Sequence, residues 1–121
     1  EINFNSSNND FQKALKITKK VKRTALSANQ LGSILTYSGN FEKAVYFHEK
    51  ALVIHKELDD NIRLAKDYSR LGTVYRYLGR FDESLNQFKN ALRLYEEQNN
   101  FSQIADTYCH IGTCLLDIWD I

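Results

Sequence analysis

The 121-residue sequence contains no proline and no methionine, and only two cysteines and one tryptophan. Without proline, no position in the chain forces a helix to break or kink. No apolar run approaches the roughly 20 residues that a membrane-spanning helix needs, so we expect no membrane partner. The N-terminus, EINFNSSNNDF, lacks the basic and apolar regions of a signal peptide. Because an initiator methionine is also missing, we expect a fragment of a longer protein.

The two cysteines lie in one stretch that we expect to be helical. Cys109 and Cys114 are five residues apart, and their side chains should point about 140° apart on a helix. They cannot form a disulfide with each other in that geometry. Two unpaired thiols are typical of a reducing compartment, and we therefore expect a cytoplasmic protein.

Positive charge is concentrated near the N-terminus, although the formal net charge of the whole chain is only +1. Residues 11–41 contain no acidic side chain. Their basic side chains are Lys13, Lys16, Lys19, Lys20, Lys22 and Arg23. On a helix these charges point to several sides, and no aromatic platform accompanies them. The run is better explained by a solvated helix than by a site for acidic protein, RNA or lipid headgroups.

The chain does contain an internal repeat. Residues 31–44 read LGSILTYSGNFEKA, residues 71–84 read LGTVYRYLGRFDES, and a third copy begins as IGTCLL at 111–116. Aligning 31–70 with 71–110 gives ten identities at a period of 40 residues. Such a period is typical of a solenoid in which each repeat packs on its neighbours.

Apolar residues recur at helical spacing within each copy. Leu64, Tyr68 and Leu71 lie on one face of an amphipathic helix and show no strand alternation. The pattern predicts helices at 9–20, 23–38, 41–57, 62–78, 81–97 and 102–119. Only 20 residues separate Phe11 from Leu31, so the first two helices are joined by a very short connection or fused into one.

The predicted helices form a single domain at 9–121, preceded by a frayed or disordered segment at 1–8. This domain divides into a partial repeat, two full repeats and a second partial repeat, at 9–22, 23–61, 62–100 and 101–121.

Each repeat is expected to contain one tight turn and one longer turn. Gly39 and Gly79 follow periodic segments and suit the left-handed C′ position that ends a helix. Asn40 is placed to cap the helix that follows. The second break in each unit is a softer polar cluster, at 59–61 and 98–100.

Three glycines lie inside predicted helices, where glycine costs about 1 kcal/mol relative to alanine. Gly32, Gly72 and Gly112 recur at the repeat step, which indicates close approach of a second helix at each of them. The small partners of that contact, and the large residues that fill the space around it, are expected at Ala44, Ser84, Ala51, Ala91, Leu31, Leu71, Phe41 and Phe81.

The repeat resembles the tetratricopeptide repeat (TPR) family, whose unit carries aromatic-x2-L-G-x2-Y, then G-x-aromatic-x2-A, then a second alanine. The resemblance covers about residues 25–116. The second copy matches in order at Tyr68, Leu71, Gly72, Tyr75, Gly79, Phe81, Ser84, Phe88 and Ala91. The first copy matches more loosely at Ala28, Leu31, Gly32, Leu35, Gly39, Phe41, Ala44, His48 and Ala51.

The resemblance implies an all-α fold of antiparallel helix-turn-helix units stacked as a right-handed superhelix. The family's usual period is about 34 residues, and a proline often ends its second helix. This chain lacks that proline, and its longer period resembles that of the subgroup found in kinesin light chains and spindle-orientation adaptors.

In this family the first helices of successive units line a concave surface where peptides bind. The resemblance therefore implies a peptide-binding groove at Asn29, Gln30, Ser33, Thr36, Tyr37, Lys66, Ser69, Arg70, Thr73, Arg76, Tyr77, Asp106, Cys109, His110, Thr113 and Asp117. Its basic and amide side chains are expected to hydrogen-bond the ligand's backbone or carboxylates, and its tyrosines to pack against ligand side chains. Ser69 and Asp106 break the pattern of the carboxylate-clamp subgroup, so we do not expect a chaperone's acidic tail as the ligand.

The sequence carries no catalytic motif. It has no glycine-rich phosphate loop, nucleophile elbow or HExxH, and its carboxylates fall on predicted solvent faces, so we expect no enzyme activity and no cofactor. Cys109, His110 and Cys114 lack a fourth ligand for zinc. His48 occupies the position of Phe88 in the repeat, which indicates a core histidine.

The sequence thus predicts a protein-interaction module that binds a peptide segment or partner domain. A regulatory or sensor segment of a larger signalling protein is the alternative, and nucleic-acid binding through 13–23 is a third. The last predicted helix either caps the array or leaves an apolar surface open, and in the second case we expect homo-oligomers. The apolar residues concerned are Leu115, Leu116, Ile118 and Trp119.

Overall fold

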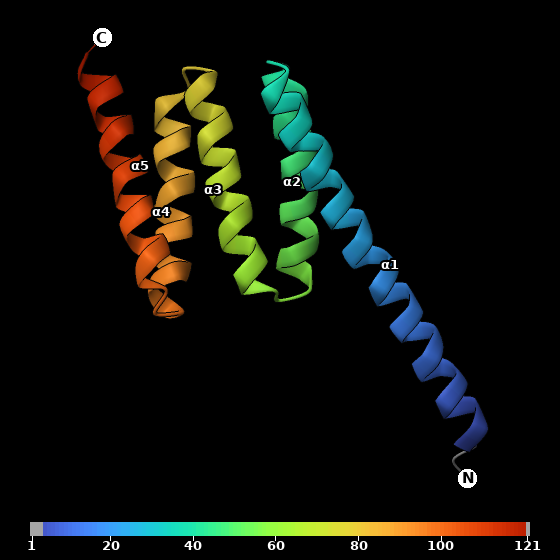
Figure 1. The fold of residues 1–121 in the computed structure, drawn as a ribbon. Coiled ribbons are helices and arrows are strands. Elements are labelled where there is room, and N and C mark those ends of the chain that lie inside the picture. The colour runs from blue at the N-terminus through green and yellow to red at the C-terminus, as the bar shows by residue number, and fades with distance from the viewer. Residues whose placement is uncertain (1–3, 121) are drawn as a thin grey trace.

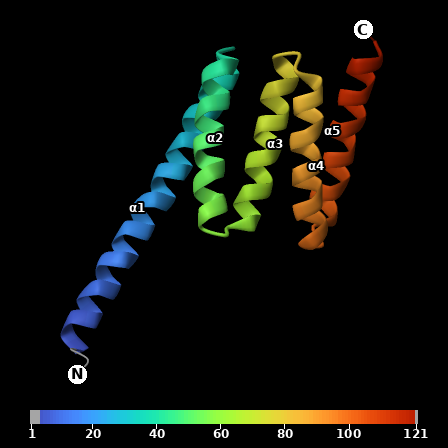
Figure 2. The same ribbon diagram turned by 180° about the vertical axis from the view of Figure 1, so that it is seen from behind.

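The computed structural model describes the backbone of residues 4–120 and the side chains of residues 8–120. Its helices are α1 (Phe4–Tyr37), α2 (Phe41–Glu57), α3 (Asn61–Tyr77), α4 (Phe81–Glu97) and α5 (Phe101–Trp119). Successive helices run in opposite directions and stack in a row, each against its neighbours in sequence (Figures 1 and 2). The described residues contain no strand, and the predicted all-α helical repeat solenoid is confirmed.

The helix boundaries differ from prediction mainly at the N-terminus. The helices expected at 9–20 and 23–38 form one continuous helix, α1, which is the fused alternative of the two that the spacing allowed. No proline or glycine lies between residues 4 and 31 to interrupt it. The helix begins at Phe4, inside the segment for which fraying was predicted, whereas residues 1–3 lie outside the described part of the chain.

The N-terminal half of α1 projects well beyond the other helices (Figures 1 and 2). Nearly all of the side chains at 8–20, including the large apolar Phe11 and Ile17, are exposed. Packing begins further along, where Ala25 and Ala28 are buried against Ala51 of α2. This half of α1 is therefore a helix without a packed neighbour in the described structure.

All four turns between helices have the same three-residue form. The second residue of each turn has a positive φ, with values of 86° at Gly39, 53° at Asp59, 75° at Gly79 and 53° at Asn99. The next amide then donates to a carbonyl five residues back, as Asn40 N does to Leu35 O at 2.8 Å. The prediction of a longer second turn is wrong, because aspartate and asparagine reach the left-handed region that glycine occupies in the other turns.

The helix caps also differ from prediction. The side chain of Asn40 makes no capping hydrogen bond, so that prediction is wrong; Glu42 in the first turn of α2 supplies the favourable charge there instead. Capping occurs at the polar turns, where Asp60 Oδ1 accepts from Arg63 N and Asn100 Oδ1 accepts from Gln103 N.

Two of the three helical glycines mark a close contact between helices. A Cβ placed on Gly32 would lie 2.8 Å from the His48 ring, and one placed on Gly72 would lie 2.8 Å from the Phe88 ring. Close approach is therefore confirmed at these two positions. The prediction is wrong at Gly112, where nothing lies within 4 Å of an added Cβ, because the described chain has no helix after α5 to pack there.

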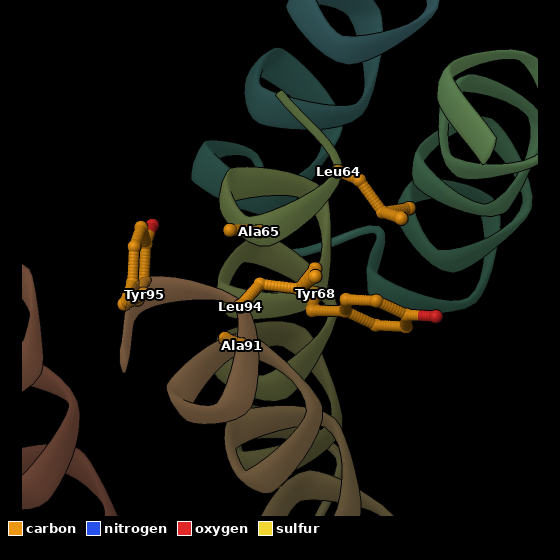
Figure 3. Packing of buried hydrophobic residues seen from close by; sticks show 6 residues of the cluster. All are labelled: Leu64, Ala65, Tyr68, Ala91, Leu94 and Tyr95. Carbon is orange, nitrogen blue, oxygen red and sulfur yellow. The ribbon is translucent and has the colours of Figure 1, made fainter. Parts of the chain in front are cut away.

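The core consists of small residues facing large ones. Figure 3 shows one cluster, in which Leu64, Ala65 and Tyr68 of α3 lie with Ala91, Leu94 and Tyr95 of α4. The predicted small partners, Ala44, Ser84, Ala51 and Ala91, are all fully buried. Each fully buried large side chain contributes roughly 1.5–3 kcal/mol.

The outer faces of the array are open at both ends. Leu71 is buried as predicted, but its counterpart Leu31 is 40% exposed because no helix of the described structure covers that side of α1. At the other end α5 packs mainly against α4 through its buried side. Trp119 of α5 is 86% exposed, so α5 does not close the array with a polar face.

Candidate peptide-binding groove

The predicted groove residues lie on α1, α3 and α5, and the structure brings only some of them together. Two adjoining clefts open between α1 and α3. They gather Asn29, Gln30, Ser33, Lys66 and Arg70. The predicted residues of α5 line neither cleft.

The larger part of the groove, which we call the upper cleft, has a volume of about 430 Å³. It is lined by Leu26, Asn29, Gln30, Ser33, Ile34 and Arg70. The part nearer the projecting end of α1, which we call the basic cleft, has a volume of about 360 Å³. It is lined by Lys22, Arg23, Leu26, Asn29, His55, Arg63, Lys66 and Arg70. Because the two clefts share Leu26, Asn29 and Arg70, they form one continuous groove.

The predicted groove set omitted Lys22, Leu26, Ile34 and Arg63, although their spacing carried a signal. Lys22, Leu26, Gln30 and Ile34 step by four along α1 and so share one face of that helix. On α3, Arg63, Lys66 and Arg70 step by three and four. The two faces form one site because α2 packs between α1 and α3 and sets the spacing between them. The residue pattern within a single helix cannot predict that spacing.

The floor of the groove is a buried polar network centred on Asp67. This carboxylate is fully buried, which corrects the expectation that the acidic residues lie on solvent faces. Its Oδ1 accepts from Asn29 Nδ2 at 2.7 Å and from Arg70 Nη1 at 3.3 Å, and its Oδ2 contacts His55 Nδ1. A buried carboxylate is tolerated only when its oxygens are satisfied in this way.

His48 extends this network beneath α1. The histidine is buried, as predicted for a core residue. Burial lowers its pKa to about 4, and the positive charge of Arg70 acts in the same direction. The ring is therefore neutral at pH 7, and its Nδ1–H donates to Asn29 Oδ1 at 2.9 Å. The network joins α1, α2 and α3 through side chains of all three helices.

The network also engages a side chain that was expected to bind a ligand. Asn29 is buried, with its amide nitrogen on Asp67 and its amide oxygen on His48. It shapes the wall that both clefts share, while Arg70 and Lys66 keep donors at the surface.

Other predicted groove residues hold α5 in place. Arg76 Nε donates to Asp117 Oδ2 at 2.7 Å, which links α3 to α5. The ring of His110 stacks on Phe88 of α4, with ring centroids 4.9 Å apart and planes 1° from parallel. Asp106 and Cys109 are exposed on α5.

The predicted threonines and tyrosines also have defined surroundings. The hydroxyls of Thr36, Thr73 and Thr113 each donate to the carbonyl four residues earlier in their own helix. Tyr37 is exposed at the end of α1, and Tyr77 stacks on Phe41 with ring centroids 5.3 Å apart. Ser69 is half-buried on α3.

Two further findings concern the described residues as a whole. None of their helices combines the length and the hydropathy that a membrane-spanning segment needs. Within the same residues, no three histidine, cysteine, aspartate or glutamate side chains are grouped so that they could hold a metal ion. Cys109 and Cys114 are both free thiols, the first exposed and the second buried.

Comparisons with known proteins agree with this architecture. Residues 23–97 match the family model described as tetratricopeptide repeat. The crystal structure of the TPR domain of Arabidopsis FLU is similar in fold, with a TM-score of 0.78 at 22% identity over 83% of this chain and 84% of that chain. No curated protein matches the sequence. The similarity to the kinesin light chain subgroup stays a prediction. With its 40-residue helical repeat, its glycine-notched hairpins and the family match over most of the array, the chain belongs to the tetratricopeptide repeat family, whose repeats generally mediate protein–protein interactions.

Proposed function

We propose that this domain binds a peptide segment of a partner protein in the groove between α1 and α3. The observation that carries the proposal is the pair of adjoining clefts on the side where the first helices of the repeats face each other. Arg70 and Lys66 offer hydrogen-bond donors there, and exposed Leu26 and Ile34 offer apolar contact. The groove combines polar groups that orient a ligand with apolar surface that is desolvated on binding.

The network beneath the groove supports the same proposal. Asp67, Asn29 and His48 are buried, and Asn29 donates to Asp67 and accepts from His48. Hydrogen bonds from three helices therefore hold the groove floor in place. A site that is already ordered loses less conformational entropy when a ligand binds. We therefore expect the groove to bind as a rigid platform.

The proposal is tested by filling the upper cleft. Ser33→Trp places a large side chain in the cleft, and Asn86→Trp places the same side chain on the exposed outer surface of α4. Peptides selected from a random library on the unmodified domain should bind Ser33→Trp about tenfold more weakly or worse, and Asn86→Trp with unchanged affinity. Equal affinity for both variants, or a library that yields no binder, would count against the groove. Circular dichroism of both variants checks that they stay helical.

We also propose self-association through α5. Its open face carries Leu115, Leu116, Ile118 and Trp119, and the Gly112 notch there is empty. The occupant we propose is the projecting part of α1 from a second copy. That segment reads NDFQKALKI at 9–17, which resembles NFEKAVYFH of α2, the helix that packs over Gly32.

This self-association has a direct test. Light scattering coupled to size-exclusion chromatography should show an oligomer whose fraction rises with concentration. Both Leu116→Glu on α5 and Phe11→Ser on α1 should return it to monomer, since each removes one side of the contact. A monomer at all concentrations would refute the proposal.

We also propose a cytoplasmic location and, as an alternative role, a regulatory segment. A cytoplasmic location rests on the two free thiols. A role as a regulatory or sensor segment of a larger protein would use the same groove, with ligand binding as its input.

A further inference from the structure

The charge on the groove is unevenly distributed. Cationic side chains from two helices line the basic cleft: Lys22 and Arg23 from α1, and Arg63, Lys66 and Arg70 from α3. The upper cleft shares Arg70 with it but has no other charged residue. One end of the groove is therefore strongly basic, and the other is neutral.

Most of this positive charge has no counter-ion in the described structure. Arg63 Nη1 donates to Asp60 Oδ2 at 2.8 Å, and Arg70 reaches Asp67. No carboxylate of the described residues lies within 4 Å of Lys22, Arg23 or Lys66. Like charges that face each other across a cleft repel, so an anion placed among them is attracted by all three.

The buried carboxylate beneath the cleft does not cancel this charge. Asp67 already receives hydrogen bonds from Asn29 and Arg70 and contacts His55, and it is sealed from solvent. The guanidinium of Arg70, which pairs with Asp67 at 3.3 Å, offsets its negative charge. The lysines at the rim are exposed to solvent and stay available to a ligand.

The neutral end of the groove adds a second requirement. Leu26 and Ile34 are 56% and 65% exposed at the upper cleft, with Gln30 and Ser33 between them. Lys22 and Ile34 are twelve residues apart on one helix, a span of about 18 Å. An extended peptide covers that span with about five residues at roughly 3.3 Å each.

The lining argues for a peptide over a nucleic acid. No phenylalanine, tyrosine or tryptophan lines either cleft, whereas sites for single-stranded nucleic acid combine basic grooves with aromatic platforms on which bases stack. The apolar end is also unsuited to a charged phosphate backbone. A chain that carries carboxylates at one end and aliphatic side chains at the other fits both ends.

We propose, building on the peptide groove of the preceding section, that the ligand is an acidic peptide segment. Its glutamate or aspartate side chains lie in the basic cleft among Lys22, Arg23 and Lys66. An aliphatic side chain about five residues away packs against Leu26 and Ile34 in the upper cleft.

The test uses two end-blocked peptides that differ only in charge. One carries three glutamates, three serines, then leucine and isoleucine, and the other has glutamine in place of each glutamate. Titration calorimetry at low and high salt should show that the domain binds the glutamate peptide about tenfold more tightly at low salt. The preference should shrink at high salt, because salt screens exposed charges.

Matched charge reversals locate the effect. Lys22→Glu/Lys66→Glu reverses two charges at the basic cleft, and Lys43→Glu/Lys89→Glu makes the same change on α2 and α4. The first variant should lose the preference for glutamate and bind a peptide with three lysines instead, while the second keeps it. Ile34→Ser should weaken binding of both peptides by similar factors, because it removes contact with their shared aliphatic end.

The contrary outcomes separate this inference from the groove itself. If the glutamine peptide binds as tightly as the glutamate peptide, the acidic preference is refuted while the groove stands. If both double variants lose the preference equally, the basic cleft is not its source. If a uridine dodecamer binds more tightly than the glutamate peptide and only Lys22→Glu/Lys66→Glu abolishes that binding, the cleft takes RNA. If neither peptide binds, the inference fails, and the library selection decides the groove independently.

Discussion

The ring of His48 fills the notch that Gly32 leaves in α1, at 2.8 Å from where a Cβ would stand. The equivalent notch at Gly72 is filled by Phe88. The first contact differs in that the ring is polar and donates to Asn29, which in turn donates to Asp67. The two hairpins therefore share one packing geometry, but only the first brings a hydrogen-bond network to the groove.

Adding one methyl group at the notch should destabilise the domain. In Gly72→Ala the new Cβ would meet the Phe88 ring at 2.8 Å, and overpacking of this kind costs about 1–3 kcal/mol. Gly112→Ala adds the same group where nothing lies within 4 Å and should stabilise α5 by up to about 1 kcal/mol. Urea unfolding of the two variants measures the direction of each change in the free energy of unfolding. Equal changes would refute the close contact at Gly72.

The stability of the domain should fall in mild acid because of His48. Its pKa is lowered to about 4 in the fold, against an ordinary value of 6.5 for a solvated histidine. Between these pH values the unfolded chain binds more protons than the folded one, so stability declines as the pH falls from 6.5 to 4. The loss should approach about 3 kcal/mol.

The replacement His48→Phe, which copies the second repeat, isolates this effect. The difference in unfolding free energy between the variant and the unmodified domain should change with pH across that window and level off on both sides. A difference that is independent of pH would show that His48 does not titrate there.

Removing the buried carboxylate should be costly. Asp67→Ala leaves His55, Arg70 and the Asn29 amide without their shared acceptor, and breaking a buried charged network costs about 3–5 kcal/mol. Asp82→Ala, on an exposed first turn of α4, should change stability by less than about 1 kcal/mol. Thermal unfolding distinguishes the two, and similar values would show that the network contributes little.

The ion pair between α3 and α5 should contribute little to stability. Arg76 and Asp117 are about one-third exposed, and pairs of this kind typically contribute about 1 kcal/mol or less. A double-mutant cycle with Arg76→Ala and Asp117→Ala measures the coupling. A coupling above about 2 kcal/mol would contradict the expected screening by solvent.

Much of the fold could be predicted from the sequence, because the residues that set each helix and turn lie close together in the chain. The bounds of α2 and α4 follow from apolar spacing and the flanking turn residues, and both were predicted at the bounds observed. The notch at Gly72 followed from repetition, since a helical glycine retained at a fixed step needs a steric reason. The length of the turn at Asp59 was predicted wrongly, because aspartate adopts a positive φ too rarely for its presence in a sequence to predict a tight turn.

The groove residues could be predicted from the sequence only in part, because they come from different helices and are brought together by helix packing. Lys22 and Arg23 were assigned to a solvated run, and their partnership with Lys66 arises where α3 comes to face α1. Asp67 was assigned to a solvent face, and its burial depends on Asn29 and His55 arriving from α1 and α2.

The amino-acid sequence by itself determined the helices, their repeat and the family, since periodicity, turn residues and glycine positions act over a few residues at a time. The tertiary structure alone decided that Gly112 stands open, and that a basic and an apolar patch adjoin across two helices. These features depend on distances between helices, which packing sets after the local structure has formed.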